Sequence, residues 1–276
     1  MAQNLIDVGS VRIGQGQPLA LVAGPCLAES LELCLDVAAA MRDRCRTLGI
    51  GYIFKASFDK ANRSSIESDR GPGMAQGLRW LRQVAERLGV PVATDVHESV
   101  QVPQVAQTVD LLQIPAFLCR QTDLLTAAAH TGKPINVKKG QFMSPSEMAY
   151  VAQKLQHAHQ GGAGLMFTER GTFFGYHRLV NDFVGLGDLM DLGYPVCFDV
   201  THSTQQPGGQ GARSGGRPER AKLLARCAIA AGVDCLFLET HPDPTSAQSD
   251  TDVMLPLDQA TELLGELICW HRFNGT

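Results

Sequence analysis

Nine residues with side chains that bind anions or metal ions stand at or beyond the ends of short apolar runs in the sequence. Five of them are cations: Lys55, Lys60, Arg63, Lys138 and Arg170. Arginine binds phosphate or carboxylate groups with two hydrogen bonds, and lysine binds them as a compact point charge. Five cations exceed what one monophosphate needs. They indicate two anionic ligands, or one ligand with both a phosphate and a carboxylate. The alternative interpretation is that these cations lie on the surface and form ion pairs with the helices.

The other four residues are of types that bind transition metals. They are Cys26, His202, Glu239 and Asp250. A thiolate, an imidazole and two carboxylates suit a divalent cation such as Zn²⁺, Fe²⁺ or Mn²⁺. Their spacing alone proves no site, because Cys26 could be a core thiol, His202 a general base and Glu239 the partner of a lysine or arginine. Only a fold that closes on itself would bring the four together.

Eight short apolar runs precede these residues, and segments with helical periodicity lie between several of them. The runs are too short for helices and too uniformly apolar for a one-sided sheet, which is typical of parallel strands buried on both faces. The expected strands are residues 19–23, 52–56, 90–96, 111–115, 134–138, 164–168, 196–200 and 235–239. The expected helices are residues 31–48, 78–88, a helix that a capping box at Ser144 starts and that runs to about residue 159, 220–231 and 257–271.

The alternation of strands and helices favours parallel pairing with right-handed crossovers, and eight such units in 276 residues favour a closed barrel. We therefore expect an α/β protein with one (β/α)8 TIM-barrel catalytic domain over residues 1–276. Residues 1–18 should add a short N-terminal element, such as a hairpin under the barrel. Residues 203–218 are rich in Gly and Gln and are expected to form a mobile active-site loop, or else a flexible insertion. An open doubly wound sheet would need a glycine fingerprint after the first strand, and residues 23–26 lack it.

The composition disfavours several classes of protein. The net charge is −4, whereas nucleic-acid binding needs clustered cations. No apolar stretch reaches the about 20 residues that span a bilayer, and the first ten residues do not resemble a signal peptide. The eight cysteines are scattered without a C-x-x-C pair, so disulfides are not expected. We expect a soluble cytoplasmic protein that binds neither nucleic acid nor membrane.

Segments at the expected strand ends resemble one family over nearly the whole chain, from about residue 19 to residue 256. The segments are AGPC (23–26), KASFDKANRSS (55–65), GPGM (71–74), TDVHE (94–98), QIPAF (113–117), NVKKGQ (136–141), TERG (168–171), FDVTHSTQQ (198–206) and ETHPD (239–243). They resemble the 3-deoxy-D-manno-octulosonate-8-phosphate synthase family, and KANRSS is the most specific part. The related 3-deoxy-D-arabino-heptulosonate-7-phosphate synthases usually carry a Lys-Pro-Arg-Ser/Thr variant there.

The resemblance implies a homotetrameric transferase of lipopolysaccharide inner-core biosynthesis. Such an enzyme condenses phosphoenolpyruvate with arabinose 5-phosphate and gives 3-deoxy-D-manno-octulosonate 8-phosphate and inorganic phosphate. It also implies roles for individual residues. Phosphoenolpyruvate would be held by Lys55, Lys60, Lys138 and Arg170, with Gln141 beside it. The sugar phosphate would be held by Asn62, Arg63, Ser64 and Asp95, and Arg120 would reach the sugar phosphate of a neighbouring subunit. The cavity would be lined by Gln113, Pro115, Ala116 and Phe117.

The family has a metal-free class with Asn after Gly-Pro and a metal-dependent class with Cys there. Cys26 implies the second class, with His202, Glu239 and Asp250 in the matching positions. The residues expected to act in catalysis are His202, Lys60, Lys138 and Asp95. We expect His202 to be a metal ligand first and a base second, Asp95 to accept a sugar hydroxyl, and His97 to be a strand-end histidine with a structural partner. Gly140 departs from the pattern, which has Pro there, and puts the geometry around Gln141 in doubt.

Three alternatives stay open. A heptulosonate synthase would use erythrose 4-phosphate in place of the five-carbon sugar. A metal hydrolase or isomerase on a barrel usually has several His and Asp ligands, often with H-x-H on the first strand, and residues 24–26 lack this pattern. A non-catalytic phosphosugar-binding protein would keep the cations but would have no use for the Cys/His/Glu/Asp set.

Overall fold

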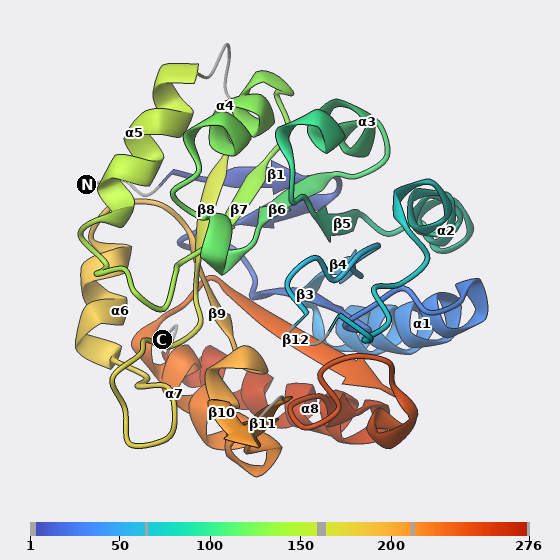
Figure 1. Ribbon diagram of the computed structural model, residues 1–276. Helices are drawn as coiled ribbons and strands as arrows, with labels where there is room; N and C mark the ends of the chain where they lie inside the picture. The colour runs from blue at the N-terminus through green and yellow to red at the C-terminus, as the bar shows by residue number, and fades with distance from the viewer. Residues whose placement is uncertain (1–3, 64–65, 159–163, 211–212, 275–276) are drawn as a thin grey trace.

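Eight parallel strands close into a barrel, as the sequence predicts. The computed structural model describes residues 4–63, 66–158, 164–210 and 213–274. The barrel strands are β3 (Ala20–Gly24), β4 (Gly51–Lys55), β5 (Val92–Asp95), β6 (Leu111–Ile114), β7 (Ile135–Lys138), β8 (Leu165–Glu169), β9 (Val196–Asp199) and β12 (Cys235–His241). Each strand pairs in parallel with the next, and β12 pairs with both β9 and β3, which closes the ring (Figure 1). A two-residue strand, β13 (Leu255–Pro256), pairs with the end of β12.

Helices surround the barrel, and most of them follow a strand (Figure 1). They are α1 (Leu31–Leu48), α2 (Met74–Leu88), α3 (Val102–Ala106), α4 (Thr122–His130), α5 (Met148–Ala158), α6 (Phe183–Met190), α7 (Ala221–Ala231) and α8 (Leu257–Asn274). Short 3₁₀ helices lie at Ser99–Gln101, Ala116–Leu118, His202–Thr204, Pro218–Arg220 and Pro244–Ser246.

Local signals explain where the predicted helices begin and end. The prediction for α1 is confirmed at both ends: the Ser30 side chain accepts from the Leu33 N–H at 3.1 Å, and Gly49 ends the helix at φ 72°. The Ser144 N–H donates to the Glu147 side chain at 2.8 Å, so the capping box forms, although α5 begins only at Met148. The predicted end of this helix, near residue 159, lies outside the described residues. Helices α3, α4 and α6 were not predicted, because they are short and α6 contains two glycines.

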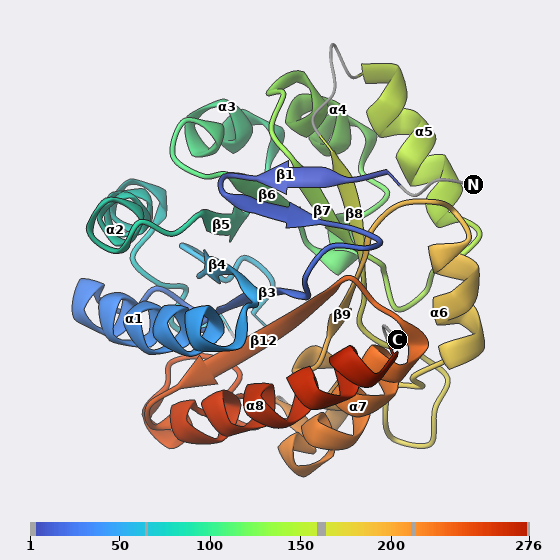
Figure 2. The same cartoon turned by 180° about the vertical axis from the view of Figure 1, so that it is seen from behind.

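The N-terminal segment forms the predicted extra element. Strands β1 (Ile6–Val8) and β2 (Val11–Ile13) pair as an antiparallel hairpin. Alternate apolar side chains of both strands are buried, while Asp7 and Arg12 form an exposed ion pair. The hairpin lies across the amino ends of the barrel strands (Figure 2), and its buried side chains belong to the same apolar cluster as the barrel interior.

The inside of the barrel changes from apolar to charged along the strands. Every second residue of a strand points inward. The inward residues near the amino ends form one apolar cluster with the hairpin: Ala20, Val22, Ile53, Ala93, Leu111, Met166, Cys197, Cys235 and Phe237. Nearer to the carboxyl ends, the inward side chain of six strands is a charged group or an amide, and we call these residues the polar layer: Lys55, Asp95, Gln113, Lys138, Asp199 and Glu239. Each of them is at most 6% exposed. Buried charges are costly unless they are paired or bind a ligand.

The Gly- and Gln-rich segment after β9, predicted as a mobile loop or a flexible insertion, contains two paired strands in the structure. Strands β10 (Gln205–Gln210) and β11 (Arg213–Gly216) pair as an antiparallel ribbon with a register shift between Gln206 and Gln210. The ribbon starts beside the cavity at the carboxyl ends of the strands. In the part of the chain that the structure describes, no helix is long and apolar enough to cross a membrane.

Candidate active site

A cavity of about 660 Å³ opens at the carboxyl ends of the barrel strands. It brings together most of the predicted site residues. Those that line it are Lys55, Lys60, Asn62, Arg63, Asp95, Gln113, Pro115, Ala116, Phe117, Lys138, Gln141, Arg170, His202, Glu239 and Asp250. Cys26 lies buried in contact with this group, Arg120 is exposed and does not line the cavity, and Ser64 lies outside the described residues.

One side of the cavity is a hydrogen-bonded group around Ser57, on the segment after β4. The Ser57 hydroxyl accepts from Lys55 Nζ at 2.8 Å and from Lys60 Nζ at 3.0 Å, and it donates to Asp95 Oδ1 at 2.6 Å. Burial alone would lower the pKa of Lys60, but Cys26, Glu239, Asp95 and Asp250 around it raise that pKa above its usual range. Lys60 therefore carries a full positive charge into the cavity. His97 Nε2 lies 2.9 Å from Asp95 Oδ2, so the expected structural partner of His97 is present.

The opposite side of the cavity is built on Lys138, Asp199 and His202. Lys138 Nζ lies 2.5 Å from Asp199 Oδ2 and 3.6 Å above the ring of Phe237, the outermost residue of the apolar cluster on β12. Burial lowers the pKa of Lys138, and Asp199 offsets part of this effect. Burial would raise the pKa of Asp199, but His202 and Lys138 hold it below its usual range. The pair is therefore ionised and lies directly on the apolar floor of the cavity.

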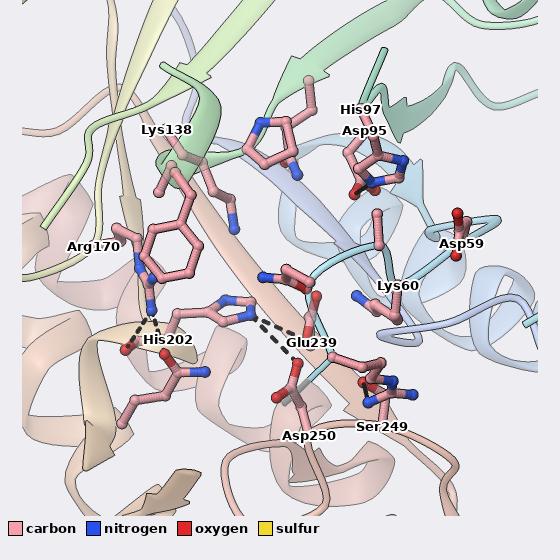
Figure 3. A pocket seen from close by; sticks show the side chains of 18 of the residues that line it. Asp59, Lys60, Asp95, His97, Lys138, Arg170, His202, Glu239, Ser249 and Asp250 are labelled. Carbon is pink, nitrogen blue, oxygen red and sulfur yellow. Dashed lines mark hydrogen bonds and ion pairs between the residues drawn. The ribbon is translucent and has the colours of Figure 1, made fainter. Parts of the chain in front are cut away.

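Arg170 comes from the segment after β8 and lines the cavity on the same side as His202 and Lys138 (Figure 3). Its Nη2 donates to the Gln205 side chain and, at 3.4 Å, to the His202 carbonyl oxygen. Its buried Nε has no hydrogen-bond partner among the described residues. Arg170 is thus held in place at one end of the guanidinium and has a donor left for a ligand.

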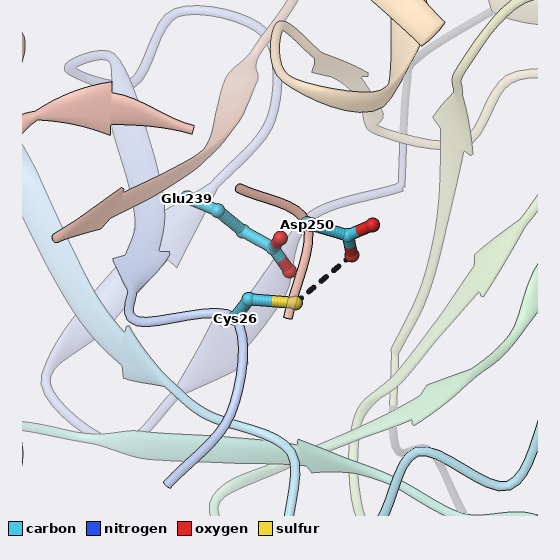
Figure 4. A group of neighbouring side chains, drawn as sticks. All are labelled: Cys26, Glu239 and Asp250. Carbon is cyan, nitrogen blue, oxygen red and sulfur yellow. Dashed lines mark hydrogen bonds between the residues drawn. The ribbon is translucent and has the colours of Figure 1, made fainter. Parts of the chain in front are cut away.

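The four predicted metal ligands lie together, although they come from three separate parts of the sequence. The ligand atoms of Cys26, Glu239 and Asp250 lie within 4.8 Å of one another (Figure 4), and Cys26 Sγ lies 3.0 Å from Asp250 Oδ2. His202 Nε2 lies 3.6 Å from Glu239 Oε2 and 3.7 Å from Asp250 Oδ2 (Figure 3). We call these four residues the ligand cluster. It forms because β12 pairs with both β3 and β9, whose ends lead to Cys26 and His202.

The chemistry of the cluster fits a divalent transition-metal ion. Glu239 is 1% exposed, and neither of its carboxylate oxygens has a hydrogen-bond partner among the described residues. Burial, followed by the charges of Asp250 and Glu239, raises the pKa of the Cys26 thiol well above its usual value. A cation would satisfy the Glu239 oxygens and would displace the thiol proton, as metal binding does at cysteine sites. Asp250 has a φ of 49°, an uncommon backbone conformation for a residue other than glycine, and such conformations concentrate at functional sites.

Arg63 connects two loops at the mouth of the cavity. Its Nε donates to the Asp69 carbonyl oxygen at 2.8 Å, its Nη1 to Ser249 Oγ at 2.9 Å and its Nη2 to the Gln248 carbonyl oxygen at 2.8 Å. The loop after β4 is thereby joined to the loop after β12, which carries Asp250. Gly140, next to Gln141 in the chain, is closely packed: a Cβ atom there would lie 2.8 Å from Phe142 Cζ and 3.1 Å from the Ala116 carbonyl oxygen.

Three residues that hold the site together were not predicted from the sequence: Ser57, Asp199 and Gln205. The inward alternation of the strands could have identified Asp199, because it lies two residues beyond the inward-facing Cys197 and so belongs to the polar layer. Ser57 lies in the segment after β4 and Gln205 begins β10 outside the barrel, and neither position follows the periodic pattern of the barrel strands.

Comparisons with known proteins agree with this geometry. A model of the DAHP synthetase I family matches residues 3–270. The chain is 55% identical to a 2-dehydro-3-deoxyphosphooctonate aldolase of Cyanothece sp., and the match covers 93% of each chain. It is 53% identical to a protein of the same name from Dechloromonas aromatica, over 94% of this chain and 93% of that one. A third of that name, from Magnetococcus marinus, is 50% identical over 99% of this chain and 95% of its own.

Proposed function

The chain belongs to the DAHP synthetase I family, and on that premise we propose that it is a metal-dependent 2-dehydro-3-deoxyphosphooctonate aldolase. In the synthetic direction the enzyme joins C3 of phosphoenolpyruvate to the aldehyde carbon of arabinose 5-phosphate. Water adds at C2 of phosphoenolpyruvate, and inorganic phosphate leaves as the C–O bond breaks.

One observation carries the proposal: the buried cations and the ligand cluster face each other within one cavity. Lys55 Nζ, for example, lies 3.6 Å from Glu239 Oε1, so the anion site and the metal-capable site share a boundary. A protein that only bound phosphosugars would need the cations but not the ligand cluster. The relatives reported above are named as aldolases, which supports an enzyme over a binding protein.

The buried cations of the cavity bind phosphoenolpyruvate and neutralise its charges. Lys55 and Lys138 are at most 6% exposed, so their charges act in a medium that screens them poorly. They neutralise the carboxylate and the phosphate, and Arg170 offers a further donor. By offsetting the negative charges of phosphoenolpyruvate, these fixed cations hold it close to the distance for attack on the sugar aldehyde.

The sugar phosphate binds nearer to the mouth. Asn62 is exposed there, Arg63 is partly exposed, and Asp95 lies deeper on the same side of the cavity. The Asp95 carboxylate already accepts a hydrogen bond from Ser57 and contacts His97. Its remaining lone pairs can accept a hydrogen bond from a sugar hydroxyl. This supports a role in orienting the sugar rather than in removing a proton.

The ligand cluster would hold the metal through Cys26, His202, Glu239 and Asp250. When bound, a divalent metal supplies Lewis-acid chemistry, either on water or on a sugar oxygen. His202 directs Nε2 toward Glu239 and Asp250 and uses Nδ1 to contact Asp199, so both ring nitrogens are committed. We therefore assign His202 primarily as a metal ligand, and only secondarily as a base.

The family resemblance supports two further parts of the proposal, a homotetramer and a product used for the lipopolysaccharide inner core. The sequence pattern supports a cytoplasmic protein of one catalytic domain (residues 1–276), with an N-terminal extension over residues 1–18 and a mobile segment at residues 203–218, of which residues 211–212 lie outside the described structure. Exposed Phe117, Phe174 and Tyr176 support association of subunits, because large apolar side chains on a surface favour protein contacts. Arg120 is exposed, which supports its assignment to the sugar phosphate of a neighbouring subunit.

A comparison of two aldoses tests the reaction. Condensation rates with phosphoenolpyruvate are measured with arabinose 5-phosphate and with erythrose 4-phosphate. We expect faster turnover of the five-carbon sugar. Faster use of the four-carbon sugar would indicate a heptulosonate synthase, and no product from either sugar would indicate a binding protein. Metal analysis of protein purified without added metal, followed by an assay with a chelator, tests the metal.

A further inference from the structure

Asp199 is the most buried charged residue next to the cavity, and it does not touch the cavity itself. It lies at the carboxyl end of β9, it is 0% exposed, and it is absent from the cavity wall. A substrate in the cavity therefore cannot contact it. Its carboxylate must act on other side chains.

The contacts of Asp199 connect His202 of the ligand cluster to Lys138, a cation that lines the cavity. Its Oδ1 accepts from the backbone N–H of His202 at 2.8 Å. Its Oδ2 is shared: His202 Nδ1 lies 2.8 Å away and Lys138 Nζ lies 2.5 Å away. His202 is thus held through its backbone and its ring at once. The Phe237 ring, whose centroid lies 5.8 Å from that of His202, packs against the same imidazole.

These contacts determine which nitrogen of His202 is available. A carboxylate beside a lysine is ionised at neutral pH and can only accept hydrogen bonds. Nδ1 of His202 must therefore carry a proton, and Nε2 is left with its lone pair for a ligand. Nε2 is also the nitrogen that lies 3.6 Å from Glu239 and 3.7 Å from Asp250. Carboxylates that orient metal-binding histidines in this way raise metal affinity in other proteins.

We propose that Asp199 is the positioning residue that keeps Nε2 of His202 directed at the ligand cluster, and that its shared oxygen links this histidine to Lys138. The inference rests on the proposed metal dependence. It adds a residue that contacts neither the substrates nor the metal, yet determines the affinity for the metal.

The substitution Asp199→Asn tests the proposal on metal binding rather than on activity alone. Asparagine keeps the size of the side chain, but its amide can donate to Nδ1 and so favour the tautomer with the proton on Nε2. Titration of metal-stripped protein with Mn²⁺ or Zn²⁺ is expected to show affinity about 10- to 100-fold lower than in the unsubstituted protein. Thermal unfolding of both proteins shows whether the variant is folded.

Asp95→Asn is the matched control. Asp95 is also a buried carboxylate of the polar layer that contacts a histidine, His97, at 2.9 Å and a lysine, Lys55, at 3.5 Å. It contacts none of the four ligands of the cluster in the described structure. We expect Asp95→Asn to lower activity while its metal affinity changes far less than that of Asp199→Asn. Equal losses of metal affinity in the two variants would mean that Asp199 acts only through its charge, and would overturn the proposal.

A spectroscopic measurement separates positioning from general stability. The ¹⁵N NMR spectrum of imidazole distinguishes a protonated nitrogen from a metal-bound one. In the unsubstituted protein loaded with Cd²⁺ we expect the proton on Nδ1 of His202 and the metal on Nε2. Metal on Nδ1 would overturn the proposal, and this result does not depend on whether any variant folds.

The outcomes also distinguish this inference from the proposed function. If the unsubstituted protein binds no divalent metal, the proposed metal dependence fails and the inference fails with it. If it binds metal and Asp199→Asn binds with the same affinity, only the inference fails.

Discussion

Sγ of Cys26 lies 3.0 Å from Oδ2 of Asp250, although 224 positions separate the two residues in the chain. The contact exists because β12 completes the ring next to β3, so the first and last strands of the barrel end side by side. The ligand cluster is therefore a direct product of barrel closure.

Cys26→Ala should abolish tight metal binding. The substitution removes the sulfur atom, so the metal would keep only three of its four protein ligands: His202, Glu239 and Asp250. We expect a loss of metal affinity at least as large as the about 10- to 100-fold cost of losing an outer-shell partner, with a parallel loss of condensation activity. Titration of metal-stripped protein measures it. Cys34→Ala is the control, because Cys34 is equally buried in α1 within the core. If both variants retained full affinity, Cys26 would not be a ligand.

Lys138→Met should damage catalysis far more than Lys139→Met. Lys138 points into the cavity, and loss of one such buried donor costs about 10²- to 10³-fold in rate. Lys139 is also buried but lies outside the cavity wall, where it pairs with Glu169 at 3.4 Å and donates to Thr172 Oγ1 at 3.1 Å. Its loss should cost about 3–5 kcal/mol of unfolding free energy, because Glu169 stays buried without its partner.

Steady-state kinetics and denaturant unfolding of both lysine variants check this difference. The prediction is contradicted if Lys139→Met lowers kcat/KM as much as Lys138→Met does while the Lys139→Met protein remains fully folded under the assay conditions.

Asp95→Asn should change how stability depends on pH. Burial would raise the pKa of Asp95, but Lys55 and His97 hold it well below its usual value. The ionised carboxylate therefore contributes stability that is complete above the unfolded-state pKa of about 4 and is lost as the pH falls toward the folded-state pKa. Asparagine takes up no proton in this range. The difference in unfolding free energy between the two proteins should be constant from pH 7 to about pH 5 and should shrink at lower pH. Urea unfolding across this range measures it, and a constant difference down to pH 3 would contradict the assigned pKa shift.

Gly24→Ala should destabilise the barrel where the strands meet the site. A Cβ atom at Gly24 would lie 2.1 Å from the carbonyl oxygen of Lys55 on β4, so the backbone of a neighbouring strand would have to move. Overpacking of this kind costs about 1–3 kcal/mol. Gly187→Ala in α6 is the control, since its Cβ would meet nothing within 4 Å, and a helical Gly-to-Ala change should stabilise the protein by about 0.5–1 kcal/mol. Thermal or denaturant unfolding should give opposite signs for the two variants.

The strands and the gross site were predictable from the sequence because both follow simple rules. All eight barrel strands lie within about two residues of their predicted positions at either end, since buried parallel strands are short, uniformly apolar runs. The predicted cations and metal-capable residues converge because the carboxyl ends of barrel strands meet at one rim. The helices α3, α4 and α6 escaped prediction, because each is too short or too rich in glycine for its periodicity to stand out.

Contacts made by loop residues were not predictable. Ser57 joins Lys55, Lys60 and Asp95 only because the segment after β4 turns back over the barrel, and no periodic pattern encodes that turn. The loop contacts of Arg63 were also not predicted: its guanidinium joins the loops that carry Asp69 and Ser249. Its assignment to the sugar phosphate stays a prediction. Composition indicated a mobile loop or a flexible insertion after β9, and it did not indicate the antiparallel pairing of the nearby strands β10 and β11.

The hairpin of β1 and β2 determines from which end of the barrel substrates can reach the cavity. The apolar side chains of the hairpin pack with the apolar cluster and fill the amino end of the barrel. Among the described residues, the cavity therefore opens to solvent at the carboxyl ends of the strands. A molecule that reaches Lys55 and Lys138 must first pass Asn62 and Phe117, which stand exposed at that entrance. We therefore expect the reactant that lies deepest in the cavity to bind before the reactant that lies nearer to the entrance, and the product that lies deepest to leave last.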